Sequence, residues 1–507
     1  MNLKDRVGKL FMIGLPSTSL DDETKRVLDE VRPGSIILFS RNIESKEQVK
    51  KYIQDITEYL GYKPLVTIDQ EGGIVTRLIE GFCVAPGTMA AAATQNPESA
   101  YKMGKILGKE MKAIGVDWDL APVVDINNNP NNPGIGVRSF SSDKNIVVNF
   151  AQRFIDGLEE EGIIACLKHF PGKGRVAVDA HLDMPELNIS KEKLMDVEIY
   201  PFKNIDSVSW MPSHIYIPCL QDKKEPATVS KSVLTTFVRE ELEYKGVLIA
   251  DDLSMGGVSN YYTPKEAAEL TFRAGMDILS FCHDSEIQIS VKKYMEEKIE
   301  NDEELRNRME ESLERLEKLY AIAKVNNNHP LEEVGTEDNN RVFKEICENS
   351  ITVYKNEDAV LPLDKVDNVF TVKLTRLVLV EDKKEGVPEI SKRISERFDA
   401  PLTIFDPKDN DEKIEDIINK AKGKINIVLT ENAHLYEGQK KVVEEIAKNS
   451  DKMILVALRN PYDVFIEGVK NSICTYGYTK NQQETVLELL EGKINAKGKI
   501  PVDWRMA

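Results

Sequence analysis

The sequence has few of the features that mark secreted, membrane or metal-binding proteins. Its six cysteines are scattered without a C-x-x-C pair, so they indicate neither a disulfide framework nor a zinc site. No stretch approaches the roughly 20 apolar residues that a membrane-spanning helix requires, and the first residues lack the long apolar core of a secretory signal. We therefore expect a cytoplasmic protein with reduced thiols and no membrane partner.

Positive charge is also scarce. The chain has 67 Lys and Arg residues against 85 Asp and Glu residues, which gives a net charge of −18 and a pI near 5.1. A protein that binds nucleic acid needs a basic surface to displace the counterions of the phosphate backbone. The composition therefore argues against a nucleic-acid partner and favours an uncharged or locally guided substrate.

The first half of the chain alternates apolar, β-branched runs with polar amphipathic stretches. Such an alternation is typical of a parallel sheet covered by helices, and about eight units in some 280 residues predict a (β/α)8 barrel of the TIM type. A doubly wound open sheet is the rival, but it would more often carry a Gly-rich phosphate turn after its first strand. The expected strands are LFMIGL at 10–15, SIILF at 35–39, LVTID at 65–69, LAPVVDI at 120–126, IIACLKHF at 163–170, VSWMPSHI at 208–215, VLIADD at 247–252 and DILSF at 277–281.

The second half repeats the alternation on a smaller scale. A charged segment at 287–325 predicts outer helices rather than a coiled coil, because its heptads do not persist. We expect two domains, with a catalytic barrel over 1–325, a polar linker over 326–340 and a smaller α/β sandwich over 341–507. The strands expected in the sandwich are LVLVED at 377–382, PLTIFDP at 401–407, INIVLTEN at 425–432, MILVALRNP at 452–460 and SICTYGY at 472–478.

The loop after the fifth expected strand carries the densest set of reactive residues. The sequence PGKG favours an irregular loop, which leads to Asp179 and His181. A carboxylate two residues from a histidine can bond one ring nitrogen, fix the tautomer and make the other nitrogen a proton shuttle. The plain alternative is a hydrogen bond that only stabilises the loop. A metal site formed by His169 and His181, with Asp183 nearby, lacks the usual ligand spacing. A phosphate loop lacks the required Ser or Thr.

Further candidate catalytic residues lie at the end of another expected strand. Asp251 and Asp252 end the strand at 247–252, and because neighbouring strand residues point to opposite faces, only one can face a substrate directly. A carboxylate there, with a proton donor on another loop, matches the needs of retaining glycoside hydrolysis. A DD pair alone is as often a helix cap or a metal ligand.

A third group of residues could bind the hydroxyl groups of a sugar at the same strand ends. Asp69 and Arg77, in IDQEGGIVTRL, could accept from and donate to hydroxyl groups, although a structural ion pair is equally expected. Arg138, Lys168 and His169 add donors.

Taken together, these motifs resemble glycoside hydrolase family 3, and within it the β-N-acetylglucosaminidases of peptidoglycan recycling. The likeness extends over nearly the whole chain, through IDQEGG, LAPVVDIN, RSFSSD, KHFPGKG with D-x-H and GVLIADDLSM to VALRNPYD and GKIPVDW. The resemblance implies that Asp251 is the nucleophile and that His181 with Asp179 is the acid/base dyad. It also implies that Asp69, Arg77, Arg138, Lys168 and His169 hold the sugar.

The resemblance further implies an exo-β-N-acetylglucosaminidase that acts by double displacement on muropeptides or chitin fragments, without a cofactor or metal. A phosphorylase that uses phosphate instead of water is one alternative, because a neutral histidine does not repel an anion. A sugar-binding protein without turnover is another. Lys173 replaces a histidine that is frequent in relatives. The change bears on the side of the site that binds the leaving group, and so on which aglycone is preferred. Oligomeric state is left open.

Overall fold

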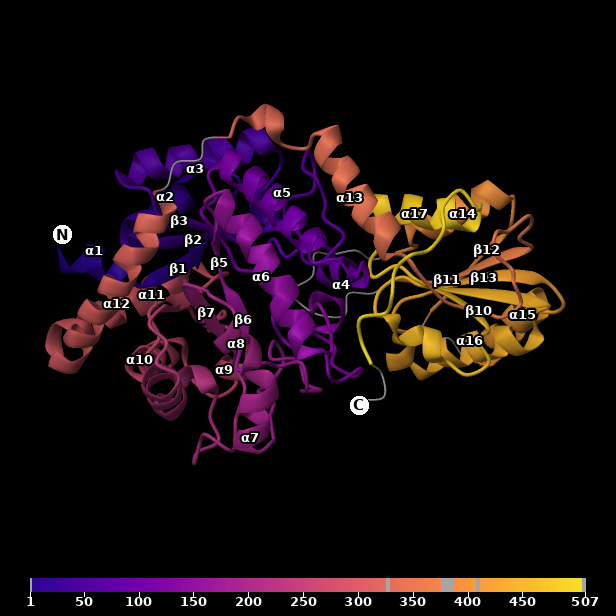
Figure 1. The fold of residues 1–507 in the computed structure, drawn as a ribbon. Helices are drawn as coiled ribbons and strands as arrows, with labels where there is room; N and C mark the ends of the chain where they lie inside the picture. Colours follow the sequence, from indigo (N-terminus) through magenta and orange to yellow (C-terminus); the bar gives the residue numbers. More distant parts are fainter. Residues whose placement is uncertain (1, 325–328, 375–385, 407–410, 504–507) are drawn as a thin grey trace.

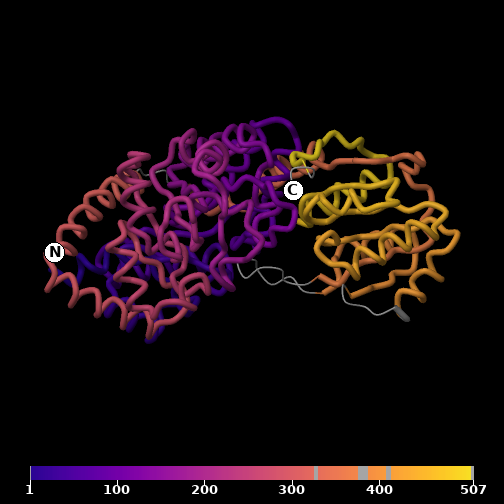
Figure 2. Tube along the Cα trace, turned by 90° about the horizontal axis from the view of Figure 1, so that it is seen from below, coloured from indigo at the N-terminus to yellow at the C-terminus, as the bar shows by residue number. Residues whose placement is uncertain are grey.

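The computed structural model describes residues 2–324, 329–374, 386–406 and 411–503. Two regions with parallel sheets lie side by side, one formed by the first part of the chain and one by the last (Figures 1 and 2). This arrangement confirms the α/β class. All six cysteines are free thiols, five of them buried. Among the described residues, no helix combines the length and apolar character needed to cross a lipid bilayer.

The first region contains a six-stranded sheet in the order β5-β4-β3-β2-β1-β9 and a three-stranded sheet in the order β6-β7-β8. All pairs within these two sheets are parallel. The strands are β1 (Phe11–Gly14), β2 (Ser35–Leu38), β3 (Leu65–Ile68), β4 (Trp118–Asp119), β5 (Ile164–Ala165), β6 (Leu167–Phe170), β7 (Ser209–Pro212), β8 (Val247–Leu248) and β9 (Leu279–Phe281).

The two sheets of the first region are joined at both edges. Cys166 alone separates β5 from β6, so the edge of one sheet continues into the edge of the other. At the opposite edges, Ile249 follows β8 and forms a parallel bridge with Ile278, which precedes β9. The strands therefore follow one another with a shared direction, and their carboxyl ends meet on one side.

One expected strand is shifted. The run LAPVVDI at 120–126 is not a strand, because β4 ends at Asp119, and only Val123 forms an isolated bridge, to Lys168. Pro122 explains the difference, since it has no N–H to donate to a ladder in the middle of a sheet.

Helices cover the outside of these sheets (Figure 1). Their apolar faces join the strands in one large core, in which α5 and α6 pack closely together. The predicted outer helices over 287–325 are α11 and α12. The α-helices are α1 (Leu3–Gly8), α2 (Asp22–Val31), α3 (Lys46–Leu60), α4 (Thr88–Ala93), α5 (Glu98–Ile114), α6 (Lys144–Glu160), α7 (Lys191–Lys193), α8 (Tyr200–Asn204), α9 (Gly256–Ser259), α10 (Pro264–Ala274), α11 (Ser285–Asn301) and α12 (Glu303–Ala323). Two π-helices, Leu194–Glu198 and Ser232–Glu241, lie among them.

The second region has one six-stranded sheet in the order β10-β15-β14-β13-β11-β12, parallel except for the antiparallel pair of β10 and β15. Its strands are β10 (Thr352–Asn356), β11 (Asn368–Val372), β12 (Leu402–Phe405), β13 (Ile425–Thr430), β14 (Lys452–Ala457) and β15 (Asn471–Cys474). Its helices are α13 (Glu337–Ser350), α14 (Glu389–Phe398), α15 (Asp411–Ala421), α16 (Glu437–Asn449) and α17 (Lys480–Leu490).

Alternate residues of these strands supply two separate cores. Ile427 and Leu429 of β13 face α14 and α17, whereas Val428 faces α15 and α16. Successive strand side chains point to opposite faces, so a strand covered on both sides is apolar at every position. The expected strand at 377–382 lies entirely outside the described residues, and β10 and β11 were not predicted.

The segment between the two regions is attached to the first. Within the described part of the predicted linker, Gly335 N donates to Glu110 Oε1 at 2.9 Å and Lys46 Nζ donates to the Val334 carbonyl at 3.1 Å. Helix α13 adds Phe343 and Ile346 to the core of the first region. The domain boundaries themselves stay a prediction.

Candidate active site

A cavity of about 390 Å³ opens at the carboxyl ends of the strands of the first region. Asp69, Arg77, His181 and Asp251 line it, together with Asp252. Residues after different parallel strands converge here because all the strands point the same way. Every described residue that lines the cavity comes from positions 12–283.

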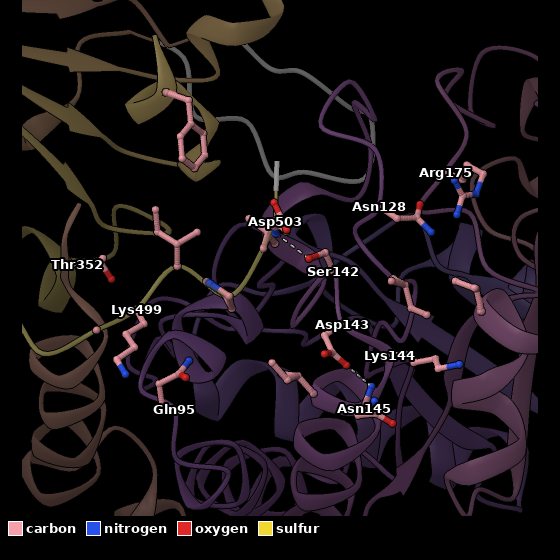
Figure 3. A pocket seen from close by; sticks show the side chains of 18 of the residues that line it. Gln95, Asn128, Ser142, Asp143, Lys144, Asn145, Arg175, Thr352, Lys499 and Asp503 are labelled. Atoms are coloured by element: carbon pink, nitrogen blue, oxygen red, sulfur yellow. Dashed lines mark hydrogen bonds between the residues drawn. The ribbon is translucent and has the colours of Figure 1, made fainter. Parts of the chain in front are cut away.

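A larger cavity, of about 1210 Å³, lies between the two regions (Figure 3). None of the predicted site residues is among the described residues that line it. Among the charged groups that line it, Lys144 pairs with Asp196 at 2.6 Å and Asp143 accepts from Asn145 N at 2.7 Å as the cap of α6. The smaller cavity is therefore the candidate active site.

The adjacent carboxylates after β8 differ in their affinity for protons. Burial alone would raise the pKa of Asp251, but nearby positive groups, Lys173 foremost, bring the pKa below its usual value. For Asp252, burial and the neighbouring charge of Asp251 raise the pKa to about 6. Such a split is a common sign of different roles in a catalytic pair. Asp251 thus has the ionised state that a nucleophile requires.

The predicted bond between Asp179 and His181 is present. His181 Nδ1 lies 2.8 Å from Asp179 Oδ1, which also accepts from the His181 backbone N–H at 3.0 Å. Burial would raise the pKa of Asp179, but its bonds and charge interaction with His181 outweigh this effect and set the pKa at about 2. With Nδ1 directed to the carboxylate, Nε2 is the nitrogen left for proton transfer.

A buried charge network, made of Asp69, Glu71, Arg138 and Lys168, lies beside the cavity. Lys168 Nζ donates to Asp69 Oδ1 at 2.8 Å and lies 2.6 Å from Glu71 Oε1. Arg138 donates to both Glu71 oxygens at 2.8 and 2.9 Å. Burial would raise the pKa of Glu71, but Arg138 and Lys168 hold it at about 2. Only Asp69 of these four lines the cavity; Arg77, which also lines it, lies 3.5 Å from Asp69.

Two histidines beside the cavity are neutral. Burial lowers the pKa of His169 well below its usual value, and its Nδ1 lies 2.7 Å from Asp125 Oδ2. Burial also lowers the pKa of His214 to about 4. Its Nδ1 lies 2.9 Å from Thr228 Oγ1, and its Nε2 lies 3.0 Å from the Asp252 carbonyl oxygen. Both rings are therefore fixed in orientation by neighbours.

Glu71 and Asp125 belong to the site although the sequence analysis did not single them out. Lys173, noted there only as a departure from relatives, belongs to it as well. Asp125 also accepts from the Lys173 backbone N–H at 2.7 Å, so it fixes both His169 and the loop that follows. The signal was present, because Asp125 follows an apolar run as Asp69 and Asp251 do. Glu71 had no such signal, since its partners come from distant parts of the chain.

The second region supports the site from outside. Asn460 Oδ1 accepts from Val137 N at 2.9 Å, directly before Arg138 in the sequence. A Cβ on Gly136 would lie 2.3 Å from the same Asn460 oxygen, so glycine is required for this approach. The second region thus holds the loop that presents Arg138.

Known proteins match the chain in sequence and in structure. The model for the glycosyl hydrolase family 3 N terminal domain matches residues 2–319. A β-hexosaminidase of Haemophilus influenzae is 34% identical over 290 residues, which are 55% of this chain and 81% of that protein. β-Hexosaminidase A of Pseudoalteromonas piscicida is 30% identical over 68% of this chain, and the match spans 63% of that longer relative.

A family 3 β-N-acetylglucosaminidase from Paenibacillus sp. str. FPU-7 has the same fold, with a TM-score of 0.89, 28% identity and 99% of each chain covered. Since the family model covers more than half of the sequence, the family predicted from the motifs is confirmed. This chain belongs to glycosyl hydrolase family 3, the family of glycoside hydrolases that its motifs indicate.

Proposed function

We propose that this chain is a retaining exo-β-N-acetylglucosaminidase, which removes β-linked N-acetylglucosamine from the non-reducing end of a glycan. One observation carries the proposal: Asp251 and His181 line a single cavity, and His181 is bonded to Asp179 at 2.8 Å. The names of the similar proteins, β-hexosaminidase and β-N-acetylglucosaminidase, support the same substrate.

We propose that β1–β9 form a closed (β/α)8 barrel in which β5 and β6 are two parts of one strand. The continuity through Cys166 and the bridge between Ile249 and Ile278 support closure at both edges. The barrel would occupy residues 1–325, and a smaller α/β sandwich residues 341–507. An active site at the carboxyl ends of the strands is what a barrel requires.

In the first step, a carboxylate oxygen of Asp251 attacks the anomeric carbon while the glycosidic C–O bond breaks. His181, protonated at Nε2, transfers that proton to the departing oxygen. Asp179 stabilises the imidazolium before the transfer and fixes the tautomer after it. The products of this step are the free aglycone and a glycosyl ester of Asp251.

In the second step, water attacks the anomeric carbon and gives a proton to the now neutral His181, while the bond to Asp251 breaks. Two displacements at one carbon restore the original configuration, so the released sugar is the β-anomer. Asp69 and Arg77 in the cavity, with Arg138, Lys168 and His169 behind it, are the proposed groups for the sugar hydroxyls.

Substrate assays test this proposal. We expect hydrolysis of a nitrophenyl N-acetyl-β-glucosaminide and of chitobiose, little hydrolysis of the matching β-glucoside, and β-N-acetylglucosamine as the first product detected by NMR. Muropeptides are a second substrate class for comparison. An α-anomer as first product, or no turnover of any of these substrates, would refute the proposal.

Addition of inorganic phosphate separates hydrolysis from phosphorolysis in the same assay. The proposed hydrolase releases free sugar at a rate that phosphate does not change. Sugar 1-phosphate as the main product would instead identify a phosphorylase, and binding of N-acetylglucosamine without turnover would identify a sugar-binding protein.

A further inference from the structure

The segment that carries His181 is poorly anchored by apolar packing. This dyad loop, residues 178–183, has two apolar side chains that lie in solvent, with Val178 47% and Leu182 67% exposed. Ala180 alone of its apolar side chains is buried, and it is small. The stabilisation from burying apolar side chains scales with the area that they remove from water. Because this loop buries so little apolar area, other interactions must hold His181 in place.

Hydrogen bonds from one distant segment supply this anchoring. Residues 256–261, here named the clasp, donate four times to the dyad loop. Gly256 N donates to the His181 carbonyl at 3.1 Å and Gly257 N to the Ala180 carbonyl at 2.9 Å. Asn260 Nδ2 donates to the Leu182 carbonyl at 3.0 Å, and Tyr261 Oη donates to Asp183 Oδ1 at 2.7 Å. Among the residues that the structure describes, these bonds are the ones that tie the dyad loop to a distant part of the chain.

The two glycines of the clasp allow this close approach. A Cβ on Gly256 would lie 2.4 Å from the Leu182 carbonyl oxygen and 2.8 Å from that of His181. A Cβ on Gly257 would lie 2.9 Å from His214 Cβ. Both glycines stand in the first turn of α9, where backbone N–H groups have no partner within the helix. Here these N–H groups are satisfied by the dyad loop.

The clasp also begins close to the proposed nucleophile. Only Leu253, Ser254 and Met255 separate Asp252 from Gly256, and Leu253 N is bonded to the Ser280 carbonyl of β9 at 3.0 Å. The clasp is therefore a short, fixed extension of the strand end that presents Asp251. Through it, the proposed nucleophile and the proposed acid/base are held by the same segment.

We propose that the clasp sets the position of His181 relative to the glycosidic oxygen, with Asn260 and Tyr261 as positioning residues. This inference rests on the proposed function. A positioning role has a specific consequence, because a displaced imidazole impairs proton transfer but leaves the attack of Asp251 intact. Losses should therefore be large for leaving groups that need protonation and small for those that do not.

The test compares chitobiose, whose leaving group is a sugar alkoxide, with a dinitrophenyl N-acetyl-β-glucosaminide, whose leaving group departs unprotonated. Tyr261→Phe removes the hydroxyl and keeps the ring. We expect kcat/KM on chitobiose to fall about 5-fold, with less than about 2-fold change on the aryl substrate. Gly256→Ala forces the loop carbonyls away, and we expect kcat/KM on chitobiose to fall about 100-fold.

Tyr59→Phe is the matched control. Tyr59 is 39% exposed and donates to Asp29 at 2.7 Å, whereas Tyr261 is 48% exposed and donates to Asp183 at the same distance. The two substitutions remove the same kind of bond, one remote from the site and one in the clasp. Tyr59→Phe should leave both substrates unaffected.

A double-mutant cycle with His181→Ala shows whether the clasp acts through the imidazole. In the His181→Ala background, Tyr261→Phe should have no further effect on chitobiose, because the group that it positions is gone. Additive losses, or equal losses on both substrates, would overturn the positioning role. Wild-type activity in Tyr261→Phe together with wild-type activity in a folded Gly256→Ala would also overturn the positioning role.

The outcomes also separate this inference from the proposed function. If His181→Ala itself does not discriminate between the two leaving groups, the acid/base assignment fails. If His181→Ala discriminates and the clasp variants do not, the assignment stands and only the clasp proposal fails.

Discussion

The two sides of the cavity are built in different ways. On one side, the buried charge network of Asp69, Glu71, Arg138 and Lys168 fixes its members through several short ion pairs, and Lys168 and Glu71 are at most 2% exposed. On the other side, the dyad loop has exposed apolar side chains and is held by four hydrogen bonds.

This difference bears on how the two sides respond to change. Removal of one member of a buried ion pair leaves its partner charged in a poorly solvated site, which costs stability as well as function. Removal of a hydrogen bond from a partly exposed loop costs little stability. We therefore expect substitutions in the network to impair folding and binding together, and substitutions in the loop to impair proton transfer alone.

The proposed nucleophile, Asp251, should give the largest effect. Asp251→Asn removes the attacking carboxylate, and we expect kcat/KM on an aryl N-acetyl-β-glucosaminide to fall at least about 10⁴-fold. Asp252→Asn is the control, because its raised pKa marks a different role, and its loss should be far smaller. Equal losses in the two variants would remove the distinction between the carboxylates.

His181→Ala tests the loop side. Because the proposed role of the imidazole is to protonate the leaving group, we expect about a 10³-fold loss on chitobiose and a loss of about 10-fold or less on a dinitrophenyl substrate in the first chemical step. Pre-steady-state release of dinitrophenol measures that step. Thermal unfolding of the variant should change less than that of a network variant, because Asp179 loses one partner whereas Glu71 has two.

Glu71→Gln tests the network side and should impair both substrates alike. We expect a loss of about 100-fold in kcat/KM, without dependence on the leaving group, and a free energy of unfolding lower by about 3 kcal/mol. Glu23→Gln is the control, because Glu23 pairs with Arg26 on the exposed surface at 2.8 Å. A loss on chitobiose alone would contradict the division between the two sides.

The stability contributed by Glu71 should depend on pH. Its pKa is about 2 in the folded protein against an ordinary value of 4.5, so the folded state favours the ionised form. The stabilisation is fully present above pH 4.5 and is lost as the pH falls towards 2. The difference in unfolding temperature between wild type and Glu71→Gln should therefore narrow over this range. A difference independent of pH would show that the charge is not its cause.

Local motifs and strand ends could be predicted from the sequence, whereas contacts between distant segments could not. The dyad of Asp179 and His181 is local, and strand-end carboxylates such as Asp251 follow from the periodicity of apolar runs. Glu71 was missed because its partners, Arg138 and Lys168, are distant in the sequence and meet only in the folded chain. The clasp was missed for the same reason, and the fourth strand was misplaced because Pro122 interrupts an otherwise strand-like run.

Identification of a covalent intermediate tests the central claim most directly. In His181→Ala, a dinitrophenyl N-acetyl-β-glucosaminide can still glycosylate the enzyme, but hydrolysis of the ester is slow because the base is absent. Rapid quenching and peptide mass mapping should locate one N-acetylglucosaminyl group on Asp251. An adduct on Asp252 or any other residue, or no adduct while the aryl group is released in a burst, would contradict the account.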